Sequence, residues 1–551
     1  MGSPRGAAVH VGRIGALAVA LGIGAWALVN GTGVASAEAT DAADTSATQS
    51  ATQSPKQSPT QSVKRSAAPG AAARGAAGAR STSGDSRRTP AGSPRAAASR
   101  AKAPGPFRAN SVATTAAVTP TRTGTGSGVA APSAAPSAAA VAAAVAAAAV
   151  PATLGSAPVG WVTGQSNSGY PGIGWAQTNN TSWAGVYGTD VGTMWLNGVN
   201  DTVQIAFGDT FSGPNMTGNW RSNILLLSRD LQLYDGLSLI NTGYANQFIP
   251  AARNQVFFIG SETTNIPTSA VYANANNYVN YMSVKSWDSP GRWTTNYSAI
   301  SMYNPTTDKW DLQTSSVRSA GWFRSSAPYR AGDQNFQQMA YVLQPESQVA
   351  STGGIRYVYA LGTPAGRAGS AFLSRVPENA ITDLSQYDYW DGTTWVKDRP
   401  AVAAPIIGDS PNSAGLFGFV VDLANNPNFF GGWFAGLFGA KSGGNVSEMS
   451  IQYNDYLGKY VILYGNGLNN VILRTADTPE GAWSDPVTIA TSVQYPGLYA
   501  PMIHPLSGTG QLTDASGQPD ASTLYWNMSL WGNYNVVLMK TDLSALKTAL
   551  V

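Results

Sequence analysis

Two aspartates stand at the open end of a predicted hairpin, and paired carboxyl groups can carry out acid–base chemistry. Asp190 ends the segment Gly-Thr-Asp, and Asp209 lies in Phe-Gly-Asp-Thr. Directly opposed residues of two antiparallel strands have Cβ atoms about 5 Å apart, where two negative charges repel unless one carboxyl keeps its proton. Cleavage of a glycosidic bond uses such a pair, with one protonated acid and one ionised base or nucleophile. The alternative is that either aspartate caps a turn, as is common for Gly-Asp-Thr.

The hairpin that would position the two aspartates consists of strands 191–196 and 202–207, joined by the turn 197–200. Apolar residues then share one face of the hairpin. The predicted opposed pairs are Leu196 with Val203, Met194 with Ile205, Gly192 with Phe207, and Asp190 with Asp209. A slip by one residue would break this arrangement, because successive side chains point to opposite faces of a strand.

An apolar strand followed by a turn and an aromatic residue recurs along the rest of the chain. The strands are Ile224–Asp230, Ile300–Tyr303, Ala371–Arg375, Val471–Ala476 and Val536–Lys540, and the aromatic residues after the first four are Tyr234, Trp310, Trp390 and Trp483. A repeated strand unit of this kind is typical of propeller blades. We therefore predict an all-β fold, a five-bladed β-propeller over residues 156–551, closed by pairing a strand near Trp161 with the last blade. An unrelated pair of β-sandwiches is the alternative.

The composition divides the chain into two parts. Up to Gly155 there are 14 Lys and Arg against 4 Asp and Glu, which leaves 19 basic and 26 acidic residues from Ser156 onward. The acidic balance of the second part disfavours nucleic acid as a partner, because phosphate binding needs clustered Lys and Arg. The chain has no cysteine and two histidines, which excludes disulfides, thiolate metal sites and a cysteine nucleophile.

The first 155 residues are predicted to target the protein and not to fold. Residues 1–37 have the basic start, the short apolar run and the Ala-Ser-Ala site of a signal peptide, the alternative being an uncleaved anchor. Residues 38–155 are rich in Ala, Ser, Thr, Pro and Arg, and we predict a disordered linker. No later segment is a convincing transmembrane helix. We expect the protein to be secreted or associated with the cell wall, and we expect it to be a monomer.

Five motifs in order give the chain a resemblance to a known family. They are the Asp190 and Asp209 segments, Arg221-Ser-Asn223, Leu361–Arg367, Ser447–Ser450 and Ala500–Pro505. Over 159–542 the sequence resembles the actinobacterial family catalogued as domain of unknown function 4185, some of whose members are assigned to glycoside hydrolase family 183, the endo-D-arabinanases. The resemblance implies a five-bladed propeller that cleaves α-linked D-arabinofuranose chains of arabinogalactan and lipoarabinomannan, with inversion. It places the catalytic pair at Asp190 and Asp209.

Other residues are weaker candidates. Arg221, Asn223 and Arg367 are predicted to donate hydrogen bonds to sugar hydroxyl groups. The alternative for Arg221 is a structural ion pair with Asp230 or Asp235, and the alternative for Arg367 is that it fixes its own Gly/Pro loop. Glu448 is a candidate third carboxylate, or a solvated residue at the start of a strand. His504 is a weak candidate beside an axial cation such as calcium, or a core residue; no Asp-x-Asp-x-Asp loop supports a metal, so we expect no cofactor.

Aromatic residues of the body could stack on sugar rings. Four tryptophans are candidates, some of which must instead belong to the core: Trp183, Trp195, Trp220 and Trp531. The Phe-rich insertion 416–444 departs from what a plain sugar hydrolase needs. It could pack on the domain, line the cleft or touch wall lipid.

Three functions follow from these observations. The first is a secreted endo-acting hydrolase of cell-wall D-arabinan. The second is a wall-associated lectin or adhesin on the same propeller, and the third is a structural wall protein whose basic tail contacts anionic polymer. The aspartate pair favours the first, because a lectin has no reason to oppose two carboxylates.

Overall fold

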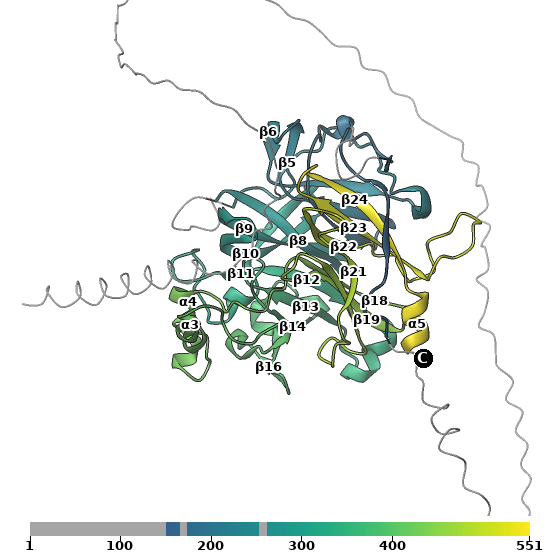
Figure 1. The fold of residues 1–551 in the computed structure, drawn as a ribbon. Helices are drawn as coiled ribbons and strands as arrows, with labels where there is room; N and C mark the ends of the chain where they lie inside the picture. Colours follow the sequence, from purple (N-terminus) through teal and green to yellow (C-terminus); the bar gives the residue numbers. More distant parts are fainter. Residues whose placement is uncertain (1–149, 166–173, 253–261, 551) are drawn as a thin grey trace, which may run out of the picture. The chain divides into compact units, whose positions relative to one another are not determined.

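The computed structural model describes residues 150–165, 174–252 and 262–550. The predicted signal peptide and nearly all of the predicted linker lie outside these residues. Within them the fold is mainly β, and Figure 1 shows strands throughout, with short helices at the edges. None of the helices in the described ranges is long and apolar enough to cross a membrane.

Five larger sheets follow one another along the chain. In each, the first three strands are added in sequence order, counted from the strands that begin at Val191, Thr264, Gln338, Met449 and Leu498. The third sheet then adds its last strand beside its third strand, and the fifth adds the two N-terminal strands. The first sheet contains β3 (Val191–Asn197), β4 (Thr202–Phe207) and β7 (Ile224–Ser228). The second contains β8 (Thr264–Ala273), β9 (Asn276–Ser289), β10 (Arg292–Asn304) and β11 (Lys309–Ser319). The third contains β12 (Gln338–Leu343), β13 (Tyr357–Thr363), β14 (Ala371–Pro377), β15 (Asp388–Trp390), β16 (Trp395–Lys397) and β17 (Pro405–Ile407).

The last two sheets complete the series, and the fifth contains the N-terminal strand. The fourth sheet contains β18 (Met449–Asn454), β19 (Lys459–Gly465), β20 (Val471–Ala476) and β21 (Val487–Ala490). The fifth contains β22 (Leu498–Ile503), β23 (Thr523–Leu530), β24 (Asn535–Asp542), β1 (Ser156–Trp161) and β2 (Ala176–Gln177). A separate hairpin contains β5 (Thr210–Gly213) and β6 (Thr217–Arg221), and the helices are α3 (Gly418–Ala424), α4 (Ala435–Phe438) and α5 (Ser544–Leu550).

The repeated segments found in the sequence occupy equivalent places. They form or overlap β7, β10, β14, β20 and β24, each of which is the third strand of its own sheet. The predicted pairing of a strand near Trp161 with the last repeat is also observed, because β1 pairs antiparallel with β24 and Trp161 lies opposite Val537. Trp161 is fully buried in the core shared by the fourth and fifth sheets. Contacts with the body begin before the predicted boundary, since the carbonyl oxygen of Ala152 accepts a hydrogen bond from the amide of Thr488.

The first strands of the five sheets contact one another in a cycle. β3 contacts β8, β8 contacts β12, β12 contacts β18, β18 contacts β22, and β22 contacts β3. These strands are buried along most of their length, as in β22, where every residue is buried. A strand covered on both faces is apolar without alternation, and several residues of the candidate site lie at the ends of these strands.

Candidate active site

The two aspartates lie beside two local irregularities of the predicted hairpin. The pairs Leu196–Val203 and Met194–Ile205 are as predicted, but Phe207 pairs with Val191 and not with Gly192. The extra residue is a β-bulge at Val191 and Gly192, which both have positive φ, 68° and 72°. Bulges commonly re-aim side chains next to active sites.

A compensating bulge lies on the opposite strand. Between the pairs Gly188–Phe211 and Val191–Phe207, the first strand has two residues (189 and 190) and the second strand has three (208 to 210). The amide of Gly208 donates a hydrogen bond to the carbonyl oxygen of Asp190 (3.1 Å). The predicted direct opposition of Asp190 and Asp209 is therefore wrong in register, because Gly208 takes the place opposite Asp190.

The Asp190 carboxyl is held in its neutral form. Its Oδ2 accepts a hydrogen bond from the hydroxyl of Tyr499 (2.9 Å), and its buried Oδ1 has no hydrogen-bond partner among the described residues. Burial, then the negative charge of Asp209, raises the pKa of Asp190 to about 8, with a smaller contribution from Glu448. The two aspartates therefore share one electrostatic site, although their backbones are not in direct register.

The Asp209 carboxyl is closer to its ionised form. Its Oδ1 accepts hydrogen bonds from Thr264 Oγ1 (2.5 Å) and from the indole Nε1 of Trp220 (3.0 Å). Burial raises the pKa of Asp209 to about 6, and these two donors oppose the rise. At pH 7 the site thus holds one protonated and one ionised carboxyl group, which can act as acid and base.

Arg367 and Glu448 lie next to the pair, and the structure brings both of these predicted residues into the site. The Arg367 guanidinium bonds both carboxylate oxygens of Glu448, the shortest contact being 2.8 Å. It also lies over the rings of Tyr499 (5.3 Å) and Trp293 (5.9 Å). Burial works to raise the pKa of Glu448, but the ion pair holds it below its ordinary value.

The other two predicted hydrogen-bond donors serve the fold. The terminal nitrogens of Arg221 donate to the backbone carbonyl groups of Ala184, Gly185 and Ala245. Asn223 is fully buried, and its amide exchanges hydrogen bonds with the backbone around Ile249. Both side chains fix loops, because each is directed to backbone groups. These contacts give no support to the sugar-binding role predicted for the two residues.

His504 also lies away from the pair. It follows β22, whereas Tyr499 is near the start of that strand, so five residues, or roughly 16 Å of extended chain, separate them. His504 is fully buried, and burial lowers its pKa to about 3. His504 is therefore placed as a core residue, which is the alternative given for it above, and burial favours its neutral form. No group of three or more His, Asp or Glu side chains suited to a metal occurs among the residues that the structure describes.

The tryptophans separate into core and surface. Trp195 is buried, with its Nε1 bonded to Asn277, and Trp183 packs against the core of the first sheet. Trp220 and Trp531 are 45% and 61% exposed, and Trp531 stands against the ring of Tyr499 at 6.5 Å. These two can therefore offer ring faces to a ligand beside the carboxyl groups.

Several residues of the site were missed in the sequence. Tyr499, Thr264, Trp293 and Tyr534 all contact or electrostatically influence the residues described above. Tyr499 directly precedes the motif Ala500–Pro505, and that was the available signal. The others belong to no motif.

One rule explains why these residues meet. Asp190, Thr264, Glu448 and Tyr499 lie at or just before the starts of β3, β8, β18 and β22. These are the first strands of four sheets, and each contacts the next such strand around the cycle. Asp209 and Arg367 follow second strands, β4 and β13, which run back toward the same end. Residues more than 300 positions apart therefore form one site.

The Phe-rich insertion lies beside the third sheet. Its helices α3 and α4 contact each other, and Figure 1 shows them as a pair at the edge of the strands. One of its faces lines a cavity against the third sheet. The other exposes apolar side chains, with Phe419 68% and Phe430 73% exposed. Of the three roles considered for the insertion, packing on the domain is observed.

The chain matches one protein family and is similar to several solved structures. The model of the family described as Domain of unknown function (DUF4185) matches residues 176–540, which contain all the residues of the site. None of the curated proteins matches the chain.

Among solved structures, the chain is similar to the native arabinanase of Bacillus subtilis (11% identity, 64% of this chain and 94% of that chain, TM-score 0.33). It is also similar to a mutant of the α-L-arabinanase of Cellvibrio cellulosa (12%, 64% and 90%, 0.35). A third is the α-L-arabinofuranosidase of Podospora anserina (11%, 72% and 99%, 0.33).

Proposed function

This chain belongs to the family described as Domain of unknown function (DUF4185), and from that premise and the site geometry we propose that it is a glycoside hydrolase. The observation that carries the proposal is the pair Asp190 and Asp209, whose surroundings separate their pKa values to about 8 and about 6. Two carboxyl groups in one site with separated pKa values are the requirement of glycosidic hydrolysis.

The surroundings assign the roles. Asp190 is the acid: it donates its proton to the glycosidic oxygen as the bond from that oxygen to the anomeric carbon breaks. Asp209 is the base: it accepts a proton from a water molecule whose oxygen bonds to the anomeric carbon. The products are a free hydroxyl group and a hemiacetal of inverted configuration. Thr264 and Trp220 support the ionised base, since both donate to Asp209 Oδ1.

Arg367 and Glu448 hold the substrate. The guanidinium is fixed by its ion pair with Glu448 and is about one quarter exposed, so its outer edge can donate to sugar hydroxyl groups. Trp220 and Trp531 offer exposed ring faces beside the pair, and apolar sugar faces stack on such rings. A site with stacking surfaces that are open to solvent suits attack within a chain.

The substrate we propose is the α-D-arabinofuranosyl chain of cell-wall arabinogalactan and lipoarabinomannan. This rests on the motif resemblance described above, and the proposed secretion of the protein rests on the predicted signal peptide over residues 1–37. The fold we propose is a closed five-bladed β-propeller. Its support is the cycle of contacts among β3, β8, β12, β18 and β22, together with the pairing of β1 with β24.

The test is to incubate the purified protein with arabinogalactan and to measure released oligosaccharides by mass spectrometry, with the Asp209→Asn variant as the control. Release by the wild type alone supports the proposal. Binding of the polymer without release from any arabinan, by a folded protein, would favour the lectin function instead.

A further inference from the structure

A second hollow lies beside the site, between the Phe-rich insertion and the third sheet. Its volume is about 540 Å³, within the roughly 300–1,000 Å³ typical of small-ligand sites. One wall comes from the insertion and the other from the third sheet and the loops before it. Its polar and charged lining residues include Asn335, Ser370, Asn412, Asp422, Asn426 and Lys441.

The walls of this cavity are fixed in place. Gln334 Nε2 donates to Asn425 Oδ1 (3.0 Å) and so joins the loop before β12 to the insertion. The amide nitrogen of Asn425 in turn donates to the carbonyl groups of Val421 and Gly439 at 2.8 Å each. The cavity is therefore already formed in the free protein, which lowers the entropic cost of binding.

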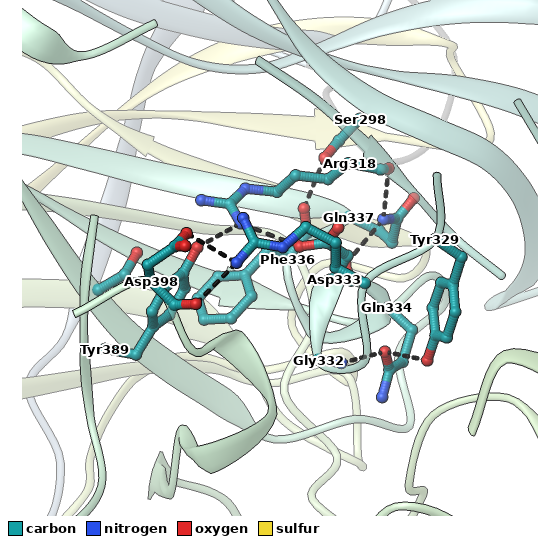
Figure 2. A network of polar contacts seen from close by, with 12 residues as sticks. Ser298, Arg318, Tyr329, Gly332, Asp333, Gln334, Phe336, Gln337, Tyr389 and Asp398 are labelled. Atoms are coloured by element: carbon teal, nitrogen blue, oxygen red, sulfur yellow. Dashed lines mark hydrogen bonds and ion pairs between the residues drawn. The ribbon is translucent and has the colours of Figure 1, made fainter. Parts of the chain in front are cut away.

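The short helix η3 (Asp333–Asn335) is anchored on the side away from the insertion. Figure 2 shows Asp333 bonded to the buried guanidinium of Arg318 (3.1 Å), and Gln337 bonded to the backbone of both residues. The Arg318 guanidinium is also enclosed by the rings of Phe336, Tyr387 and Tyr389. This cluster leaves Asn335 at the cavity in a rigid position.

The cavity presents one buried amide oxygen without a partner and further exposed amide groups. Asn335 is 8% exposed, and its Oδ1 has no hydrogen-bond partner among the described residues. A buried amide oxygen in that state costs free energy until a donor reaches it. Asn412 and Asn426 add exposed amide groups on the opposite wall.

The charge of the cavity is balanced. Its charged lining residues are Asp422 and Lys441, which face each other at 3.9 Å. The rest of the lining consists of amides, a serine, prolines and apolar side chains, the largest of which are Phe372 and Leu423. A neutral ligand with many hydroxyl groups and apolar C–H faces fits this lining, whereas a phosphate or a carboxylate has no unpaired cation there.

The cavity is continuous with the catalytic segments. Ser370 is three residues from Arg367, or roughly 10 Å of extended chain, and the carbonyl oxygen of Ala368 between them accepts the amides of Gly444 and Asn445. Glu448 follows four residues after Gly444. A glycan chain running from the carboxyl pair toward the insertion would reach the cavity within a few sugar units.

From these observations we propose that the cavity under the insertion is a remote subsite that binds the neutral arabinofuranosyl chain several units from the bond that is cleaved. The proposal rests on the proposed hydrolase function. It assigns the insertion a role in recognising long chains, in which Asn335, Asn412 and Asn426 hydrogen-bond sugar hydroxyl groups.

The test compares the wild type with the double variant Asn412→Ala/Asn426→Ala. The matched control is Asn428→Ala, an exposed asparagine two residues after Asn426 that does not line the cavity. Initial rates are measured on polymeric arabinan and on an arabinofuranosyl disaccharide glycoside, which is too short to reach the cavity from the carboxyl pair. Circular dichroism and thermal unfolding confirm that each variant folds.

We expect the KM for the polymer to rise about tenfold in the double variant, since tenfold is about 1.4 kcal/mol, or about 0.7 kcal/mol for each of the two lost hydrogen bonds. The kcat on the polymer and both parameters on the short glycoside should change less than twofold, and the control should match the wild type. An unchanged KM for the polymer, or an equal loss on both substrates, would overturn the proposal.

Binding measured by calorimetry separates this proposal from the hydrolase function. The probe is the same polymeric arabinan, titrated into the wild type and the double variant, each carrying Asp209→Asn to prevent turnover. If the wild type cleaves nothing but its affinity for the polymer falls about tenfold in the double variant, the hydrolase function fails and the cavity remains a glycan site. Equal affinities would reject the cavity whatever the outcome for hydrolysis.

Discussion

Gly208 lies against the carboxyl group of Asp190, and a side chain at this position would displace that group. A Cβ atom added at Gly208 would lie 2.5 Å from Asp190 Oδ1, well inside van der Waals contact. The amide of the same glycine donates to the Asp190 carbonyl oxygen. The motif Phe-Gly-Asp-Thr therefore does two things, since it carries Asp209 and leaves room for the partner carboxyl.

We predict that Gly208→Ala displaces the Asp190 carboxyl and lowers kcat at least about 100-fold, the scale expected for misplacing a group by about 1 Å. Far-ultraviolet circular dichroism should be unchanged, because the φ of Gly208 is not in the left-handed region. Gly155→Ala is the matched control, since no atom lies within 4 Å of its added Cβ. Full activity of Gly208→Ala on arabinan would show that the Asp190 carboxyl need not occupy this position.

Replacing either aspartate by asparagine should lower activity without lowering the stability of the fold. Asp190→Asn and Asp209→Asn should each lower kcat by about 10²–10⁴, the usual contribution of a general acid or base. The folded-state pKa of Asp190 is raised, so the protein loses stability as pH rises from about 4, the unfolded value, to about 8. Asp190→Asn should therefore raise the free energy of unfolding at pH 8, by about 1–3 kcal/mol, and leave it unchanged at pH 3. Urea titrations at the two pH values measure the difference, and a loss of stability at pH 8 would indicate a structural role.

The ion pair of Arg367 and Glu448 should be costly to break from one side. Arg367→Met leaves the partly buried Glu448 carboxylate without its cation, and we expect a loss of about 1–3 kcal/mol in the free energy of unfolding. The double variant Arg367→Met/Glu448→Gln should recover much of that loss, because no charge is then stranded. Both variants should have a raised KM for arabinan if the guanidinium binds substrate. Additive stability losses in the double variant would contradict a direct coupling of the two side chains.

Alternation and repetition in the sequence predict the elements, but not the irregularities that aim the catalytic groups. The pairs Leu196–Val203 and Met194–Ile205 follow from alternation alone. The bulge at Val191 and Gly192 does not, because it is held by Ser529 and Asn527, more than 330 residues away in β23. A local pattern contains no record of such a contact.

Motifs likewise identify the right segments without fixing the direction of side chains. Arg367 and Glu448 face the site because their loops follow or precede strands at one end of the sheets. Arg221, in an equally clear motif, turns to three backbone carbonyl groups instead. Tyr499 shows the converse, because it was not predicted from the sequence as a site residue although it contacts Asp190. A bulge in β22 between Tyr499 and Met502 lies beside this contact. Side-chain direction depends on the packing of neighbouring sheets, which a single sequence does not display.

The pH dependence of hydrolysis tests the assignment of acid and base. Activity requires ionised Asp209 and protonated Asp190, so kcat/KM should rise through about pH 6 and fall through about pH 8. The hydroxyl of Tyr499 donates to Asp190 and lowers its pKa. Tyr499→Phe should therefore raise the pKa of Asp190 and move the alkaline limb to higher pH, while the acid limb stays in place.

Trp220→Phe provides the reciprocal variant for that profile. Its Nε1 donates to Asp209 and lowers the pKa of that carboxyl, so its removal should move the acid limb to higher pH and leave the alkaline limb unchanged. The measurement is kcat/KM for arabinan from pH 4 to pH 10 for the wild type and both variants at constant ionic strength. If Tyr499→Phe moved the acid limb and Trp220→Phe the alkaline one, Asp190 would be the base and Asp209 the acid. If neither variant moved either limb, the two limbs would not report the ionisation of Asp190 and Asp209, and the assignment of these residues as acid and base would be contradicted.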